Sequence, residues 1–124
     1  MKRRATLAAL LMIPAAATLQ RATAQSANRL TKRELRDLLM TAKTKAEHQR
    51  IADDYKAEAD RLIEDAKDHE EMAEIYRKNP PYLASKHPGA IGYQHCRGIA
   101  ERLRQAAEKT KALAGMHEAT AKTA

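Results

Sequence analysis

The chain has 124 residues and a mass of 13.8 kDa, a length that suits one small domain rather than two. Apolar side chains make up 44% of it but aromatic ones only 3%, with four Tyr and no Phe or Trp. Four Gly and four Pro are too few for a turn-rich β-sandwich, whereas abundant Ala, Leu, Glu, Lys and Arg are typical of long helices. The composition therefore predicts an all-α protein.

The N-terminal segment has the pattern of a secretory signal peptide. Basic residues at 2–4 precede an almost unbroken apolar run over 5–17, and small residues follow at Ala22 and Ala24. We expect residues 1–24 to be the signal peptide, cleaved on the general secretion route rather than the twin-arginine route. An amphipathic N-terminal helix of a cytosolic protein is the alternative interpretation.

Cleavage would leave residues 25–124 as a single α-helical domain that is periplasmic or secreted. The apolar run is short for a bilayer span and no later segment could form one, so no membrane anchor is expected. The whole chain has 23 basic and 16 acidic residues, a net charge of +7, but residues 1–24 hold four of the basic residues and no acidic one. The remaining charge of +3, without a basic stripe interleaved with aromatic residues, argues against nucleic-acid binding.

Capping boxes mark the starts of two helices in the mature chain. The motif T-K-R-E at 31–34 opens a short amphipathic helix over about 32–42. The motif T-K-A-E at 44–47 opens a helix that continues without Gly or Pro over about 45–78.

A loop and a third helix complete the predicted fold. Asn79-Pro80-Pro81 should end the second helix, because Pro cannot continue the hydrogen-bond ladder. Residues 79–87 then form a loop, and the third helix is expected over about 88–121, starting at Pro88 or Ile91.

The two long helices carry alanine at every seventh position, which predicts an antiparallel helical hairpin with an alanine-lined seam of coiled-coil type. A second row of mostly larger side chains completes the heptads of each helix. The alanine rows are Ala52, Ala59, Ala66 and Ala73 in the first helix and Ala100, Ala107, Ala114 and Ala121 in the second. The other rows are His48, Tyr55, Leu62, His69 and Tyr76, and Cys96, Leu103, Thr110 and His117.

Two registers of the hairpin fit the predicted loop. In the favoured one the numbers of facing residues sum to about 165, so that His48 faces His117 and His69 faces Cys96. Large residues then face large ones and alanine faces alanine. In the alternative, slipped by one heptad, Tyr55 faces His117 instead.

The distribution of charge supports the pairing of the helices. Residues 45–78 contain 11 acidic and 7 basic residues, whereas residues 88–124 contain 3 acidic and 6 basic ones. An acidic helix beside a basic one is favourable, although each exposed pair contributes only about 0.2–0.5 kcal/mol.

Histidine and cysteine side chains in the seam form the candidate site. Imidazole and thiolate are ligands that suit Zn or Cu, and the two ends of the hairpin would each bring together two of them. The alternative is that these polar residues fill half-buried seam positions and fix the register. The candidate metal ligands are His48 and His117 at one end, and His69, Cys96 and the adjacent His95 at the other, with Met116 and Met72 as further sulfur ligands.

No feature of the sequence predicts an enzyme. Cys96 is the only cysteine, so no internal disulfide can form, and its seam position favours burial. A nucleophilic pair with His95 or His69 would lower the thiol pKa, but no oxyanion donor accompanies it. Motifs for covalent haem, zinc peptidases, phosphate loops and di-iron bundles are missing from the sequence. The many carboxylates of 45–78 are expected to form a solvated face.

Several short motifs resemble a set of small exported α-helical proteins encoded in bacterial genomes. The resemblance covers most of the mature chain, and it implies an exported setting without indicating an activity. The motifs are T-K-R-E at 31–34, E-H at 47–48, H-E-E-M-A at 69–73, H-C at 95–96 and H-E at 117–118.

Two functional hypotheses follow from the sequence. In the first, the chain is an exported, non-enzymatic helical protein that acts by binding a protein partner or by forming a homo-oligomer. In the second, it is an envelope metal-binding protein that uses the seam His and Cys residues for Zn or Cu. Apolar residues that flank the seam are candidates for a further interface: Ile51, Ile63, Ile75, Ile99 and Leu113.

Overall fold

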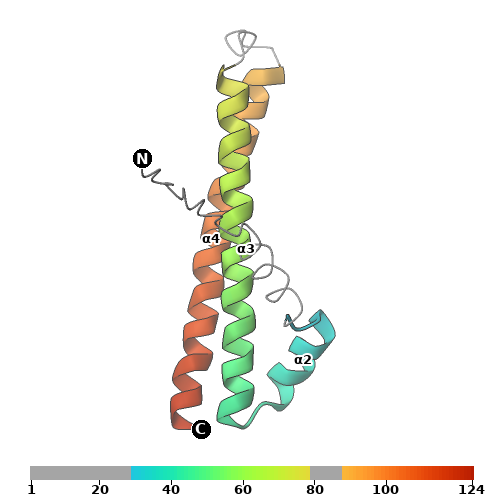
Figure 1. Ribbon diagram of the computed structural model, residues 1–124, viewed down its shortest axis with the longest axis vertical. Coiled ribbons are helices and arrows are strands. Elements are labelled where there is room, and N and C mark those ends of the chain that lie inside the picture. The colour runs from blue at the N-terminus through green and yellow to red at the C-terminus, as the bar shows by residue number, and fades with distance from the viewer. Residues whose placement is uncertain (1–28, 79–87) are drawn as a thin grey trace, which may run out of the picture.

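A computed structural model describes residues 29–78 and 88–124 (Figure 1). These residues form three helices, α2 (Lys32–Thr41), α3 (Lys45–Lys78) and α4 (Pro88–Thr123), and contain no strand. The predicted all-α fold is confirmed, and each helix ends within two residues of its expected bounds.

Two predictions concern segments outside the described residues. These are the signal peptide at 1–24 and the loop at 79–87, which includes the Asn79-Pro80-Pro81 stop. Within the described helices, no stretch is both long and apolar enough to cross a membrane.

Both predicted capping boxes are present. At α2, the Glu34 amide donates to Thr31 Oγ1 at 3.2 Å, and the Glu34 carboxylate accepts from the Thr31 amide at 2.7 Å. At α3, Thr44 and Glu47 make the same reciprocal pair at 3.2 and 2.9 Å. These bonds lower the pKa of both glutamates, because the backbone donors favour the charged carboxylate. The sequence thus sets the starts of both helices locally.

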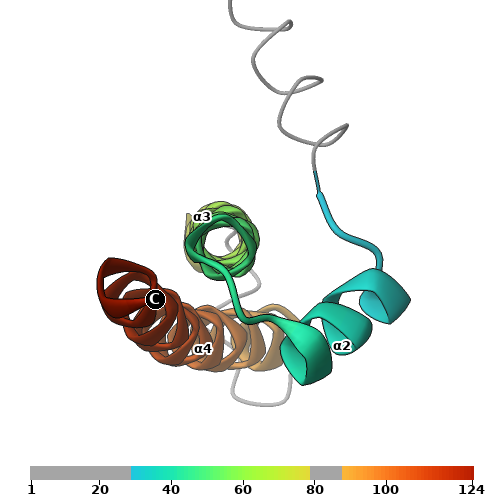
Figure 2. The ribbon, with the colours of Figure 1, turned by 90° about the horizontal axis from the view of Figure 1, so that it is seen from below.

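The long helices α3 and α4 lie side by side and antiparallel, with the start of α3 and the C-terminus at one end (Figure 1). We call this end the base, and the end at Lys78 and Pro88 the loop end. Figure 2 shows α3 along its axis while α4 runs obliquely, so the two cross as a twisted pair. The buried apolar residues along the seam are the two alanine rows, all at 0–2% exposure, with Ile51 and Cys96. The predicted alanine-lined hairpin is therefore confirmed.

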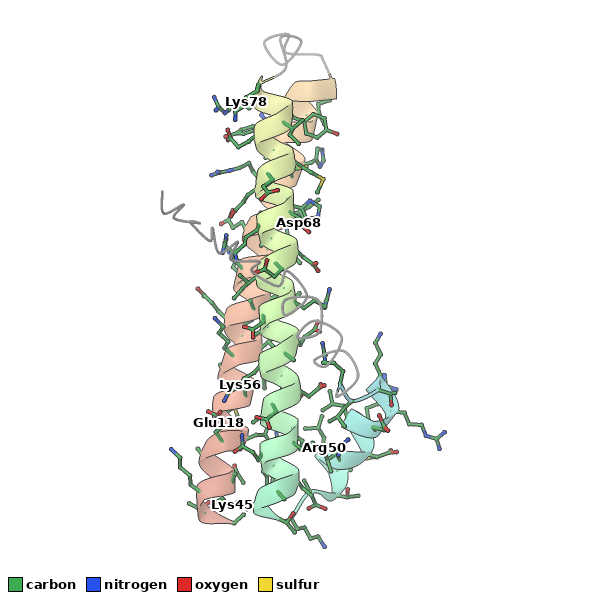
Figure 3. All side chains as sticks on the ribbon, viewed as in Figure 1. Lys45, Arg50, Lys56, Asp68, Lys78 and Glu118 are labelled. Carbon is green, nitrogen blue, oxygen red and sulfur yellow. The ribbon has the colours of Figure 1, made fainter. Side chains whose placement is uncertain are left out.

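One edge of the hairpin is held by ion pairs between the long helices. Lys56 pairs with Glu118 near the base (Figure 3). Towards the loop end, Arg104 Nε and Nη2 donate to the two oxygens of Glu70, both at 2.8 Å. These four residues lie four positions after a seam alanine, about 70° from the centre of the seam. We call this side the ion-pair edge; its exposed pairs fix orientation more than they add stability.

Helix α2 projects to the side of the hairpin beside the first half of α3 (Figures 1 and 2). It buries none of its own residues, and Leu39 and Met40 are 43% and 78% exposed. The short helix therefore adds little core of its own.

Candidate functional site

The candidate site at the base is a pair of stacked imidazoles. Nδ1 of His48 lies 3.2 Å from Nδ1 of His117, and the ring centroids are 5.4 Å apart at an interplanar angle of 26°. The Tyr55 ring also lies beside His117, with ring centroids 6.0 Å apart at an interplanar angle of 34°. The predicted meeting of His48 and His117 is thus confirmed.

These contacts define the register of the hairpin. His117 contacts both His48 and Tyr55, which are seven residues apart, so it lies opposite the position midway between them, next to Ala52. The sum of facing residue numbers is therefore about 169, between the two predicted registers. The ion pairs Lys56–Glu118 and Glu70–Arg104 have the same sum as each other, so the register is constant along the hairpin.

The predicted facing of large side chains with large ones is consequently wrong. At a sum of about 169, each alanine lies opposite a residue of the other row, so that Ala52 faces His117 and Ala73 faces Cys96. Thr110 turns its hydroxyl to the Ala106 carbonyl of its own helix, at 2.8 Å. The physical reason is packing, because a large side chain opposite an alanine allows close approach along the whole seam, whereas two facing large ones would separate the helices.

The charge state of the base pair follows from its surroundings. The pKa of His117 is lowered, first because burial disfavours the imidazolium and then because His48 lies beside it. Between the two Nδ1 atoms only one can carry the shared hydrogen, so one ring donates and the other accepts. The geometry therefore fits a pair with at least one neutral imidazole.

The loop end repeats the same pattern three heptads away. His69 and Tyr76 occupy the positions of His48 and Tyr55, and Cys96 occupies that of His117. The register places Cys96 between His69 and Tyr76, and its free thiol is buried at 8% exposure. Nδ1 of His69 is buried without a hydrogen-bond partner, so this nitrogen makes no bond to Cys96.

The remaining predicted ligands lie away from the seam. His95 is exposed on α4, Met72 is 39% exposed and Met116 is 66% exposed. Among the residues that the structure describes, no three His, Cys, Asp or Glu side chains come together as a metal site. The structure thus brings together the two histidines at the base as one geometrically defined pair.

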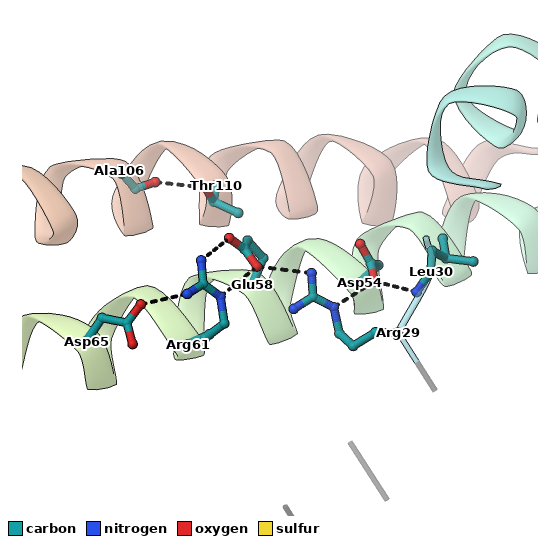
Figure 4. A network of polar contacts seen from close by, with 8 residues as sticks. All are labelled: Arg29, Leu30, Asp54, Glu58, Arg61, Asp65, Ala106 and Thr110. Atoms are coloured by element: carbon teal, nitrogen blue, oxygen red, sulfur yellow. Dashed lines mark hydrogen bonds and ion pairs between the residues drawn. The ribbon is translucent and has the colours of Figure 1, made fainter. Parts of the chain in front are cut away.

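A polar strap at the base, formed by Arg29 and Leu30 on Asp54 and Glu58, has no signal in the sequence (Figure 4). Asp54 is 6% exposed and accepts bonds from Arg29 Nε and from the Leu30 amide, both at 2.9 Å. Arg29 Nη2 also donates to Glu58 at 3.0 Å, and Arg61 reaches the same carboxylate. The expectation that the carboxylates of α3 are solvated is therefore wrong for Asp54. The partners are 24 and 25 residues apart, and no local spacing signals such a contact.

The comparisons with known proteins identify no relative. No protein-family model matches the chain, and neither a curated protein nor a solved structure is significantly similar to it. The function must therefore be inferred from the geometry of the chain.

Proposed function

We propose that this is an exported, non-enzymatic helical protein that acts by self-association, through the edge of the hairpin opposite the ion pairs. The observation that carries the proposal is a row of partly exposed apolar side chains on both long helices. Met72, Ile99 and Leu113 each precede a seam alanine and are 39%, 36% and 40% exposed. We call this row the open edge.

The open edge lies on one side of the hairpin in both helices. A residue one position before a seam alanine lies about 70° from the seam centre, opposite in sense to the ion-pair edge. At the base the same row of α3 is covered, since Ile51 is fully buried and Glu58 binds Arg29. Met72 and Ile99, nearer the loop end, have no such cover among the described residues. Leu113 lies on α4 towards the base, and Met116 borders it at 66% exposure.

The small core of the hairpin favours a partner on this edge. Of the buried apolar residues in the described chain, eight are alanine and one is Cys96, so Ile51 is the single large one. Burial of a methyl group contributes only about 0.8 kcal/mol, whereas burial of a large aliphatic side chain contributes about 1.5–3 kcal/mol. Contact of the open edge with a partner would therefore bury large aliphatic side chains, which the seam lacks.

Charge complementarity supports a second copy of the chain as the partner. In and beside the open edge α3 carries Asp65, which pairs with Arg61 at 2.6 Å, and Asp68. On the same side α4 carries Arg102 and Lys109. A two-fold axis parallel to the hairpin would place α3 of each copy against α4 of the other, acidic against basic. A two-fold axis across the hairpin would place α3 against α3 and acid against acid. We therefore infer a four-helix dimer with its axis along the helices.

Sedimentation equilibrium of the chain with and without residues 1–24, in buffer with a chelator, tests this proposal. We expect a dimer in the wild type and a monomer after Ile99→Lys or Leu113→Lys, because each buries a charge in the apolar interface. Ala112→Lys is the matched control, because Ala112 is exposed on the outer face of α4 and should leave the dimer intact. A wild type that stays monomeric at high concentration, or a dimer unaffected by the lysines, would overturn the proposal.

A further inference from the structure

We propose that His48 and His117 form a binding site for one divalent transition-metal ion of the Zn²⁺ and Cu²⁺ class at the base of the hairpin. This inference does not depend on self-association. It rests on the separation of two imidazole nitrogens that come from different helices, 69 residues apart in sequence.

The observed distance matches the separation of two ligands on one metal ion. Imidazole nitrogens bind Zn²⁺ at about 2.0–2.1 Å, and two of them on a tetrahedral ion lie about 3.3 Å apart. The Nδ1 atoms of His48 and His117 are already 3.2 Å apart. Binding requires the shared hydrogen to leave Nδ1, so that the donating ring takes the tautomer protonated at Nε2. Rotation of the two rings about their side-chain bonds would then direct both Nδ1 lone pairs to one ion.

The surroundings decide the class of ion and the number of protein ligands. The carboxylates adjacent in sequence are engaged, since Glu118 pairs with Lys56 and Glu47 accepts backbone bonds at the start of α3. Both histidines are only half-buried, so water can reach the ion and complete its coordination. Two imidazoles without a carboxylate favour Zn²⁺ or Cu²⁺ over Mg²⁺ or Ca²⁺, and Cu²⁺ should bind more tightly than Zn²⁺.

The ion would connect the start of α3 to the end of α4, at the opposite end from the loop. An ion that binds the folded hairpin but not the unfolded chain stabilises the folded state in proportion to its occupancy. Because fraying of a helical hairpin is easiest at its open end, the clamp would act where the chain has no covalent connection. A bound ion would therefore add to the stability of the base in proportion to its occupancy.

Calorimetric titration of the full-length chain with ZnCl₂ and CuCl₂ is the direct test. We expect one ion per chain, a rise in Tm with either metal, and neither effect with MgCl₂. His48→Gln and His117→Gln should each weaken binding by roughly tenfold or more, since a single imidazole cannot chelate. His95→Gln is the matched control on an exposed histidine of α4, and Cys96→Ser excludes the buried thiol as the ligand.

A second measurement does not depend on the folding of any variant. Nitrogen-15 NMR of the wild-type imidazoles should show Zn²⁺ shifting Nδ1 of His48 and His117 and leaving His95 unchanged. Absence of binding overturns the proposal, as does binding that survives His117→Gln or disappears with Cys96→Ser. A change of oligomeric state without a change in metal affinity would bear on self-association alone.

Discussion

The base and the loop end of the hairpin carry equivalent layers, each made of one His and one Tyr of α3 and one residue of α4. The two layers differ in the residue of α4. At the base His117 lies between His48 and Tyr55, and the two imidazoles satisfy each other at 3.2 Å. At the loop end Cys96 takes the place of His117, and Nδ1 of His69 is left buried without a partner. The heptad position therefore determines where a side chain lies. Its chemical type determines whether the buried polar atoms of its neighbour have a hydrogen-bond partner.

Replacing the seam alanine of each layer by a larger residue should destabilise the hairpin most. By the register of about 169, Ala52 lies opposite His117 and Ala73 opposite the smaller Cys96; both alanines are fully buried. We expect Ala52→Leu to lower the free energy of unfolding by about 3 kcal/mol and Ala73→Leu by about 1 kcal/mol, because overpacking costs more against a ring. Urea denaturation followed by circular dichroism measures both.

The exposed Ala112→Leu is the matched control and should change the free energy of unfolding little. Equal effects at Ala52 and Ala73 would contradict the register derived from the ring contacts.

Removing Arg29 should loosen the base alone. Asp54 would keep the Leu30 amide but lose its charged partner, and it is only 6% exposed. We expect Arg29→Ala to lower the free energy of unfolding by about 2 kcal/mol. This is less than the loss for breaking a fully buried ion pair, because Arg29 is itself 28% exposed.

Hydrogen exchange reads this effect locally. In Arg29→Ala, the Leu30 amide and the residues of α2 should exchange faster, while Ala73 and Cys96 at the loop end should not change. Arg33→Ala is the control, since that side chain is 92% exposed. Uniform acceleration along the hairpin would show that the strap is not a separate unit.

Replacing each seam histidine of α3 by leucine should have opposite effects at the two ends. His69→Leu removes a buried unpartnered nitrogen, and Leu62 already occupies the equivalent position one heptad earlier. We expect His69→Leu to raise the free energy of unfolding by about 1 kcal/mol. His48→Leu should lower it by about 1 kcal/mol, because it leaves Nδ1 of His117 without its partner. Thermal denaturation in the presence of a chelator compares them, and the same sign for both would refute the contrast.

Most of the fold could be predicted from the sequence because its signals are local or periodic. The capping boxes at Thr31 and Thr44 act over three residues, and the alanine rows repeat every seven. The rows predict which faces of the two helices meet. They do not determine the register, because the segment between the helices allows several registers. Only the packing of alanine against large side chains selects one of them.

The candidate site was predictable in part for the same reason. The rows predict that His48 and His117 lie on the seam. The two side chains still contact each other in the observed register, although they are not directly opposite. The strap of Arg29 on Asp54 could not be predicted, because Arg29 precedes α2 and shares no periodic relation with Asp54 of α3. The burial of Asp54 depends on that contact rather than on its position in α3.

The smallest expected effect comes from glycines inside α4. A Cβ on Gly92 would lie 2.7 Å from the ring of Tyr76, whereas a Cβ on Gly98 or Gly115 would meet no atom within 4 Å. Gly98→Ala and Gly115→Ala should each raise the free energy of unfolding by about 0.5–1 kcal/mol, because alanine restricts the unfolded chain and favours helix.

Gly92→Ala gains the same helix propensity but must displace the Tyr76 ring, so the free energy of unfolding should stay level or fall. The three variants differ by one methyl group on one helix, so chemical denaturation compares them directly. A gain at Gly92 equal to that at Gly115 would mean that Tyr76, already 38% exposed, leaves the layer freely. The loop-end layer would then lack the aromatic ring that Tyr55 supplies at the base, and the two layers would be equivalent in sequence but not in packing.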